Sequence, residues 1–248
     1  QPDKNTIHVT YNNIIHLKKH NGGTYSTIRG MYFYSVNTTG QGADTNALLA
    51  NNLIIHSDSA NFNGLKIGYN TNLDIFHNTI VGNGFVNSTS LANYSALYNE
   101  SSSSSKLNIK NNIFAINTYG IAFYNYNSDF SSINIDYNNY YADSGMFAYI
   151  GSSPANNLQE LQSLTGQDVH SLNIQPIWTD NINWNILNNS LFLVPNVGID
   201  KDILDSIRLR RRSGAYARAV QRDRKILQQN LQLRCTRRAR DLSAFKRG

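Results

Sequence analysis

The chain has 248 residues, 40% of them apolar, which suffices to bury the core of one elongated domain or two small ones. Its single cysteine, Cys235, excludes an internal disulfide framework, and no run of about 18 apolar residues could form a membrane span. The net charge of +6 is unevenly divided. Residues 1–200 carry 7 Lys and Arg against 12 Asp and Glu, a net of −5, and residues 201–248 carry 15 against 4, a net of +11. The basic character therefore belongs to the last part of the chain.

The first residues show no charged start, apolar stretch and cleavage site, so we expect no signal peptide here. A repeat follows almost at once. In residues 106–115, KLNIKNNIFA, apolar and polar residues alternate, two Asn turn the chain, and apolar residues return. This pattern predicts a short strand, a turn and the start of another strand. It recurs in residues 6–15, 47–55, 73–81 and 133–141.

The five copies share one register, anchored on an Asn. The anchors are Asn12, Asn52, Asn78, Asn112 and Asn138. Apolar residues stand five and three residues before each anchor and, in every copy, two residues after it. The residues two after the anchor are Ile14, Ile54, Ile80, Phe114 and Tyr140. Asn tolerates the positive φ of a tight turn, and stacked amides can hydrogen-bond from coil to coil. We therefore predict that the anchors form a turn and an Asn ladder.

A further strand follows each anchor, often opened by glycine, as at Gly30, Gly64, Gly120 and Gly145. The anchors are 40, 26, 34 and 26 residues apart, and the surplus falls in polar, Gly-rich segments. A fixed core motif with variable spacing is typical of a solenoid with inserted loops. Two phased strands per coil favour an all-β solenoid over a sandwich.

These repeats resemble right-handed parallel β-helix repeat proteins, the architecture of pectate-lyase-like enzymes and of many bacterial secreted or surface proteins. The resemblance implies a solenoid of about five or six coils over residues 1–155. Residues 158–178, 182–190 and 196–200 resemble the closing segments of such proteins. Leu158, Leu161 and Leu164 recur at helical spacing, with Asn156 and Asn157 as N-cap candidates and Gly166 as a stop. We therefore predict a C-terminal cap with a short helix over residues 156–200.

Residues 201–248 differ in composition from the rest: the first 200 residues contain 35 Asn and the last 48 contain one. Three interpretations stay open for this basic tail. It is the product of a shifted reading frame or a vector-derived end, a disordered segment, or a basic helix that binds nucleic acid or acidic polymers. Its Arg residues are not interleaved with stacking aromatics, so we expect no nucleic-acid partner.

Charged residues on the outer face of the first strands are the catalytic candidates. Equal positions stack from coil to coil, so Lys110 should lie beside Asp136, with Asp74 diagonal to Lys110. In the lyases that the fold resembles, acidic residues on such a face bind Ca²⁺ and a Lys or Arg abstracts a proton. The resemblance thus implies Lys110 as base and Asp74 and Asp136 as ligands or acids, but a plain cross-strand ion pair explains the same pattern. The His residues show no metal-ligand spacing, so no metal site is predicted apart from Ca²⁺ in a lyase.

Tyrosine is abundant, with 15 copies, many at predicted outward or loop positions. Its ring offers an apolar face to a sugar and its hydroxyl a hydrogen bond, although its high strand propensity alone could explain the abundance. The ligand-binding candidates are Tyr32, Tyr34, Tyr98 and Tyr124.

Two functions follow from these patterns. The first is a monomeric module of a secreted or cell-surface protein that binds a polysaccharide, a cell-surface glycan or another extracellular ligand. The second is a polysaccharide lyase, or a glycoside hydrolase, that acts on an acidic glycan. The scarcity of clustered charge favours the first.

Overall fold

The computed structural model describes residues 9–18, 27–36, 46–69, 71–84, 93–100, 105–178, 197 and 199. The chain divides into two units, residues 1–208 and 209–248. The described residues all lie in the first unit. The predicted basic tail, residues 201–248, and the end of the predicted cap lie outside the described residues.

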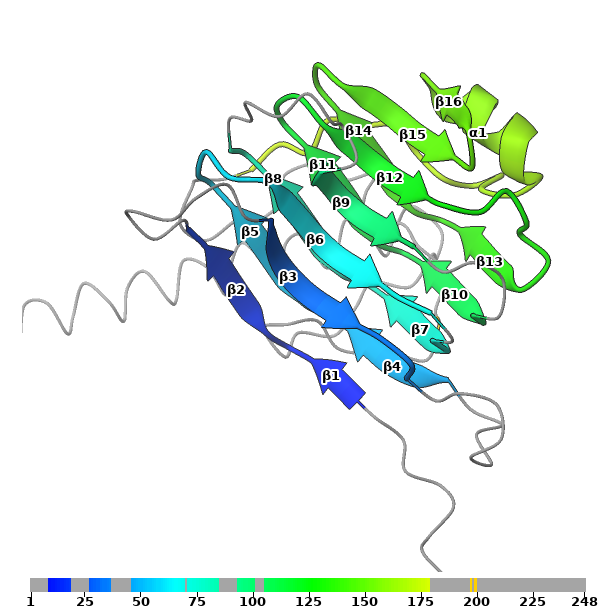
Figure 1. The fold of residues 1–248 in the computed structure, drawn as a ribbon, viewed down its shortest axis with the longest axis horizontal. Coiled ribbons are helices and arrows are strands. Elements are labelled where there is room, and N and C mark those ends of the chain that lie inside the picture. Colours follow the sequence, from blue (N-terminus) through cyan, green and yellow to red (C-terminus); the bar gives the residue numbers. More distant parts are fainter. Residues whose placement is uncertain are drawn as a thin grey trace, which may run out of the picture. The chain divides into compact units, whose positions relative to one another are not determined.

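The described chain forms a parallel β-helix, as the repeats predict (Figure 1). Three parallel sheets, here called A, B and C, each receive one strand from every coil. Sheet A contains β1 (Val9–Tyr11), β4 (Ala47–Ala50), β7 (Leu73–Phe76), β10 (Leu107–Lys110) and β13 (Ile133–Asp136). Sheet B contains β2 (Ile14–Leu17), β5 (Leu53–His56), β8 (Thr79–Gly82), β11 (Ile113–Ile116) and β14 (Asn139–Ala142). Sheet C contains β3 (Ile28–Phe33), β6 (Phe62–Ile67), β9 (Tyr94–Asn99), β12 (Ile121–Asn125), β15 (Met146–Ile150) and β16 (Ser153–Ala155).

Each coil thus contributes three strands rather than the two that the sequence predicted. The repeat motif itself divides into a sheet A strand and a sheet B strand, because the chain turns sharply between them. One residue at this corner takes a positive φ in every coil, with φ between 56° and 61°. In the first coil it is the predicted anchor Asn12 itself, and in the other coils it is the residue just before the anchor: Asn51, His77, Asn111 and Tyr137. Two adjacent residues therefore share the roles predicted for one Asn: the first takes the turn conformation and the second joins the ladder.

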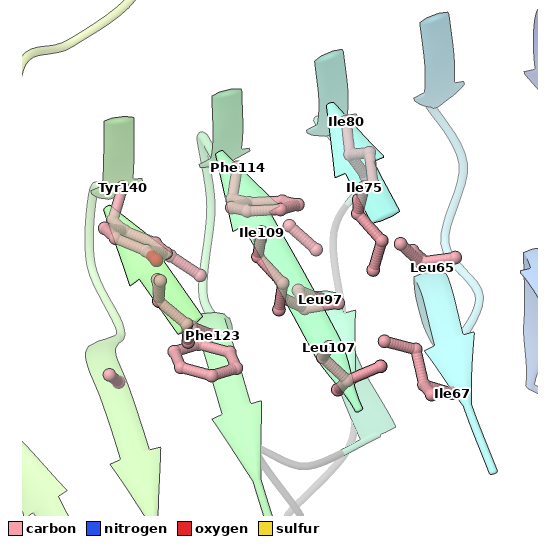
Figure 2. Packing of buried hydrophobic residues seen from close by; sticks show 14 of the residues in the cluster. Leu65, Ile67, Ile75, Ile80, Leu97, Leu107, Ile109, Phe114, Phe123 and Tyr140 are labelled. Carbon is pink, nitrogen blue, oxygen red and sulfur yellow. The ribbon is translucent and has the colours of Figure 1, made fainter. Parts of the chain in front are cut away.

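The core lies between the three sheets, where one column of apolar side chains from each sheet meets the others (Figure 2). Sheet A contributes Ile75 and Ile109, sheet B contributes Ile80 and Phe114, and sheet C contributes Leu97; all five are fully buried. Each buried side chain of this size contributes about 1.5–3 kcal/mol. The parallel register brings like positions into contact from coil to coil, so the apolar periodicity of the sequence becomes a continuous core.

The last coil is covered by a cap that occupies the free edges of the sheets. Strand β16 pairs antiparallel with β15 and covers the edge of sheet C. The side chain of Gln167 takes the edge of sheet A, accepting from Ile135 N at 2.7 Å and donating to Ile133 O at 2.6 Å. Leu172 bridges to Asn139 at the edge of sheet B. An exposed edge would invite pairing with another chain.

The predicted cap helix is present as α1 (Leu158–Thr165). Asn157 is its N-cap and accepts from Glu160 N at 2.9 Å. Gly166 ends the helix in the left-handed conformation, with φ 69°. Leu161 is buried in the core, and the partly buried Leu158 packs against it, whereas Leu164 is exposed. None of the helices among the described residues has the length and apolarity needed to cross a membrane.

Candidate functional site

The Asn ladder runs along the corner between sheets A and B. Amide Nδ2 donates to the Oδ1 of the next coil from Asn13 to Asn52, from Asn52 to Asn78, from Asn78 to Asn112 and from Asn112 to Asn138, at 2.8–3.0 Å. The ladder prediction is confirmed at Asn52, Asn78, Asn112 and Asn138, and it is wrong at Asn12. The first coil is shifted by one residue, since Asn12 takes the turn conformation and Asn13 joins the ladder.

The same shift affects the apolar residues of the first coil. Ile14, predicted to face inward, is 64% exposed, while Ile15 packs against the core. Ile15 pairs with Ile54, which places it in the inward column of sheet B. The ladder and the core therefore agree on one register, and all ladder members after Asn13 are buried. They are structural residues without access to a ligand.

The three catalytic candidates lie on sheet A in the order that the sequence predicted. Lys110 pairs with Asp136 in the neighbouring strand, and Asp74 pairs with Asn108, diagonal to Lys110. The structure thus places Lys110 next to Asp136, whereas Asp74 and Asp136 belong to strands two coils apart.

Hydrogen bonds from other parts of the chain occupy both carboxylates. Asp136 Oδ1 accepts from the backbone N–H of Tyr137 at 2.9 Å and of His170 at 2.8 Å, and Oδ2 lies 2.8 Å from His170 Nδ1. Asp74 Oδ1 accepts from Asn46 Nδ2 at 2.9 Å. In the described part of the chain, Lys66 forms an ion pair with Glu100, and the imidazole of His170 lies within salt-bridge distance of Asp136. Neither of these two contacts involves Lys110, so the described residues show no ion pair between Lys110 and Asp74 or Asp136.

A Ca²⁺ ion would need several oxygen ligands directed to one point. Both oxygens of Asp136 instead contact His170 in the cap segment that follows α1. Asp74 lies two strands away from Asp136. Over the residues that the structure describes, no three His, Cys, Asp or Glu side chains gather as a metal site would require. These residues do not fit the Ca²⁺ site of a lyase.

The predicted tyrosines lie together on the outer face of sheet C. The strand register aligns Tyr32, Lys66, Tyr98, Tyr124 and Tyr149 in one row across five coils. We call this row and its neighbours the tyrosine surface. The tyrosine surface comprises Tyr32, Tyr34, Lys66, Tyr69, Tyr98, Glu100, Tyr124, Tyr126 and Tyr149. All four ligand-binding candidates, Tyr32, Tyr34, Tyr98 and Tyr124, belong to it.

Three rings in the middle and at the far end of the row stack face to face. The centroids of Tyr98 and Tyr124 lie 4.7 Å apart with an interplanar angle of 7°, and those of Tyr124 and Tyr149 lie 5.6 Å apart with an angle of 1°. Neighbouring strands lie about 4.8 Å apart, so residues in register bring their rings to stacking distance. Because the ring faces cover one another, this stack presents ring edges and hydroxyls to solvent.

The hydroxyls of Tyr98 and Tyr124 stay protonated at neutral pH, because the pKa of each is raised above its ordinary value. Burial raises the pKa of Tyr98, and the neighbouring Tyr124 and Glu100 raise it further. Burial likewise raises the pKa of Tyr124, with a contribution from Tyr149. Each hydroxyl can therefore donate one hydrogen bond and accept others.

The other end of the tyrosine surface has a different geometry. Tyr34 meets Tyr32 and Tyr69 edge to face, with centroid distances of 6.1 Å and interplanar angles of 63° and 74°. Their exposed fractions are 45% for Tyr32, 55% for Tyr34 and 44% for Tyr69. Rings held at an angle leave part of each face open, so this end offers the apolar platforms that the stack lacks.

Gly68 makes this arrangement possible. A Cβ at Gly68 would lie 2.5 Å from Cδ2 of Tyr34, so the ring of Tyr34 occupies the space that a side chain would fill. The absence of a side chain in the second coil lets the tyrosine of the first coil lean onto it. The platform is therefore built into the backbone of two neighbouring coils.

An ion pair lies at the centre of the tyrosine surface. Lys66 Nζ is 2.7 Å from Glu100 Oε2, and the two side chains are 13% and 23% exposed. The Tyr32 hydroxyl donates to Glu100 Oε1 at 3.0 Å. Burial raises the pKa of Tyr32, and its hydrogen bond to Glu100 adds to the shift.

Sequence reasoning missed Lys66, Tyr69, Glu100 and Tyr149 as members of this surface. The four residues share no local sequence pattern, since Tyr69 follows a glycine and Tyr149 an apolar pair, whereas Glu100 follows Asn99. The strand-opening glycines were a misleading guide to register: Tyr32 stands two residues after Gly30, but Tyr124 stands four after Gly120. Only the paired strands place these residues in one row.

Comparisons of the chain with protein-family models, with curated proteins and with solved structures found no match.

Proposed function

We propose that the chain is a polysaccharide-binding module of a secreted or cell-surface protein. The tyrosine surface is its binding face. The observation that carries the proposal is the row of partly exposed tyrosines in register on sheet C, with the open rings of Tyr34 and Tyr69 at one end.

The chemistry of this face suits a sugar polymer. The apolar faces of pyranose rings pack on aromatic rings, and their hydroxyls pair with phenol hydroxyls and with charged groups at the rim. A folded β-helix holds these groups at fixed positions, so little side-chain entropy is lost on binding.

The direction of the row determines the shape of the ligand. The tyrosines of successive coils lie 4.7–5.6 Å apart where they stack, and the row crosses the strands of sheet C. An extended polysaccharide advances by a comparable distance per sugar, so each residue of the polymer meets a new coil. The ligand lies across the strands, with several sugars bound at once.

Affinity electrophoresis through native gels that contain soluble polysaccharides tests this proposal, with titration calorimetry on oligosaccharides of any polymer that retards the protein. The variant with both Tyr34→Ala and Tyr69→Ala should bind about tenfold more weakly, because both open platforms are gone.

Tyr119→Ala is the matched control. Tyr119 is 48% exposed, similar to Tyr34 and Tyr69, but it lies outside the tyrosine surface. Its truncation should leave the affinity unchanged. The proposal fails if no polysaccharide retards the wild-type protein, or if Tyr119→Ala weakens binding as much as the double variant does.

A further inference from the structure

We propose that the polysaccharide bound by the tyrosine surface is uncharged, and that Glu100 is the residue that disfavours an acidic polymer. This inference rests on the proposed function and adds the class of ligand. It follows because Lys66 and Glu100, the described charges at the centre of the surface, are paired with each other.

Lys66 is the cation that a carboxylated polymer would need in the middle of the row. Its ammonium group is already paired with Glu100 at 2.7 Å, and the side chain is only 13% exposed. The same Nζ lies 5.3 Å from the ring centroid of Tyr32 and 5.0 Å from that of Tyr98. Aromatic faces attract a cation at such distances. One carboxylate and two rings therefore hold this charge before any ligand arrives.

Glu100 leaves negative potential on the row. Its Oε2 faces Lys66 and its Oε1 accepts from the Tyr32 hydroxyl. Its charge contributes to the raised pKa of Tyr98, at the start of the ring stack. A uronate carboxylate placed over Tyr98 would meet this charge with no unpaired cation of the described chain opposite it, and like charges at close range are unfavourable.

Among the residues that the structure describes, Arg29 is the other cation that lies over a ring of the tyrosine surface. It lies on β3, the first strand of sheet C, with its guanidinium carbon 5.6 Å from the Tyr32 ring centroid. An exposed charge at one end is screened over a Debye length of about 8 Å at physiological salt. Three successive strands, β9, β12 and β15, carry the Tyr98, Tyr124 and Tyr149 stack away from it. Neutral hydroxyls are thus the main chemistry of the row.

Matched polymer pairs test this inference. Hydroxyethyl cellulose and carboxymethyl cellulose share a backbone, and so do methyl-esterified and de-esterified polygalacturonan. The wild-type protein should prefer the uncharged member of a pair that it binds. Its affinity should be constant between about 0.05 and 0.5 M NaCl, because no ion pair forms with the ligand.

The Glu100→Gln variant is the decisive test. Glutamine keeps an oxygen for the Tyr32 hydroxyl but removes the partner of Lys66, so the surface gains a free cation. Binding of the acidic member should increase about fivefold at low salt and return to the wild-type value at high salt. The preference for the uncharged member, measured as the ratio of the two affinities, should therefore shrink at low salt.

The outcomes separate the two proposals. The inference is overturned if the wild-type protein prefers the acidic member in a salt-sensitive way, or if Glu100→Gln leaves acidic binding unchanged. In the first case the proposed function still stands, because a polysaccharide is bound. If neither these pairs nor any other polysaccharide in the gels is bound, the proposed function itself fails.

Discussion

Two columns of repeated residues run along this β-helix, the Asn ladder between sheets A and B and the tyrosine row on sheet C. Both arise because a parallel register stacks one position of the repeat on the next. In the ladder, amides bond to amides and to backbone groups, and the members after Asn13 are buried. In the tyrosine surface, Tyr32, Tyr34 and Tyr69 keep about half of their area in water. The repeated register thus stabilises the fold in both columns. The tyrosine column differs because it also exposes side chains to solvent, where a ligand can reach them.

The strongest test of this contrast removes one member of the ladder. Asn112 Nδ2 donates to Ile75 O at 2.8 Å and to Lys110 O at 3.0 Å, and Oδ1 accepts from the backbone and side chain of Asn78. Asn112→Ala leaves these buried groups without partners, so the free energy of unfolding should fall by about 3 kcal/mol. Guanidinium denaturation followed by circular dichroism measures it.

Asn134→Ala is the control, since Asn134 is exposed on the neighbouring strand. It should cost less than about 0.5 kcal/mol, and Tyr34→Ala on the tyrosine surface should cost a similar amount. Equal losses for Asn112→Ala and Asn134→Ala would show that the ladder does not stabilise the fold in the way described.

A second test uses two of the buried groups, His56 and Asp168, whose pKa values shift in opposite directions. Burial lowers the pKa of His56 to about 4, and His56 stacks on Phe62 with its Nδ1 3.1 Å from the Tyr94 hydroxyl. Burial raises the pKa of Asp168 to about 6. The unfolded chain takes up a proton on His56 near the ordinary pKa of about 6.5, whereas the folded chain takes it up only near pH 4. The free energy of unfolding therefore falls as the pH falls from about 6.5 to 4. The unfolded chain loses the proton of Asp168 at a pH of about 4, whereas the folded chain keeps it until about 6. The free energy of unfolding therefore falls as the pH rises over this range.

Each group changes the free energy of unfolding by about 3 kcal/mol over this pH range. Because the two changes have opposite signs, they offset each other in the wild-type protein. The free energy of unfolding should fall with rising pH in His56→Gln and rise with pH in Asp168→Asn between pH 4 and 6.5. Denaturation midpoints at a series of pH values measure both slopes. Parallel profiles in the two variants would contradict the assignment.

The smallest expected effect sharpens the comparison on the exposed side. Gly68→Ala places a Cβ where the Tyr34 ring lies, and the ring, being exposed, can move. Stability should change by less than about 0.5 kcal/mol, while polysaccharide binding weakens about threefold as the platform is lost.

A double-mutant cycle isolates the cause. If Gly68 acts through Tyr34, then Gly68→Ala should have no further effect on binding in the Tyr34→Ala background. A full additional loss in that background would show that Gly68 affects the ligand by another route.

The fold was predictable from sequence because its signal is repeated in every coil. Alternating apolar residues and the paired polar residues at the turn specify the strands, the corner and four of the five ladder members. The first coil failed because Asn12 and Asn13 are adjacent and identical, so composition alone could not choose between them. In the second and fourth coils, Asn51 and Asn111 show the rule: the first Asn of the pair turns the chain and the second joins the ladder.

The site was less predictable, because its members do not share a motif. Tyr32, Tyr34, Tyr98 and Tyr124 were recognised by residue type, but the partners Lys66 and Glu100 depend on pairings 34 residues apart in sequence. The catalytic candidates were placed in the expected order on sheet A. What sequence could not show is that His170, from the cap, bonds to Asp136.

The cap also sets where the stack of coils stops. Gln167 bonds to the backbone of Ile133 and Ile135, Ser171 Oγ accepts from Asn138 N at 2.9 Å at the end of the Asn ladder, and β16 pairs with the last strand of sheet C. A further coil laid on this end would find these donors and acceptors already used. At this end the described part of the chain therefore presents no free edge on which a further coil could pair, unlike the open edges from which a fibre grows.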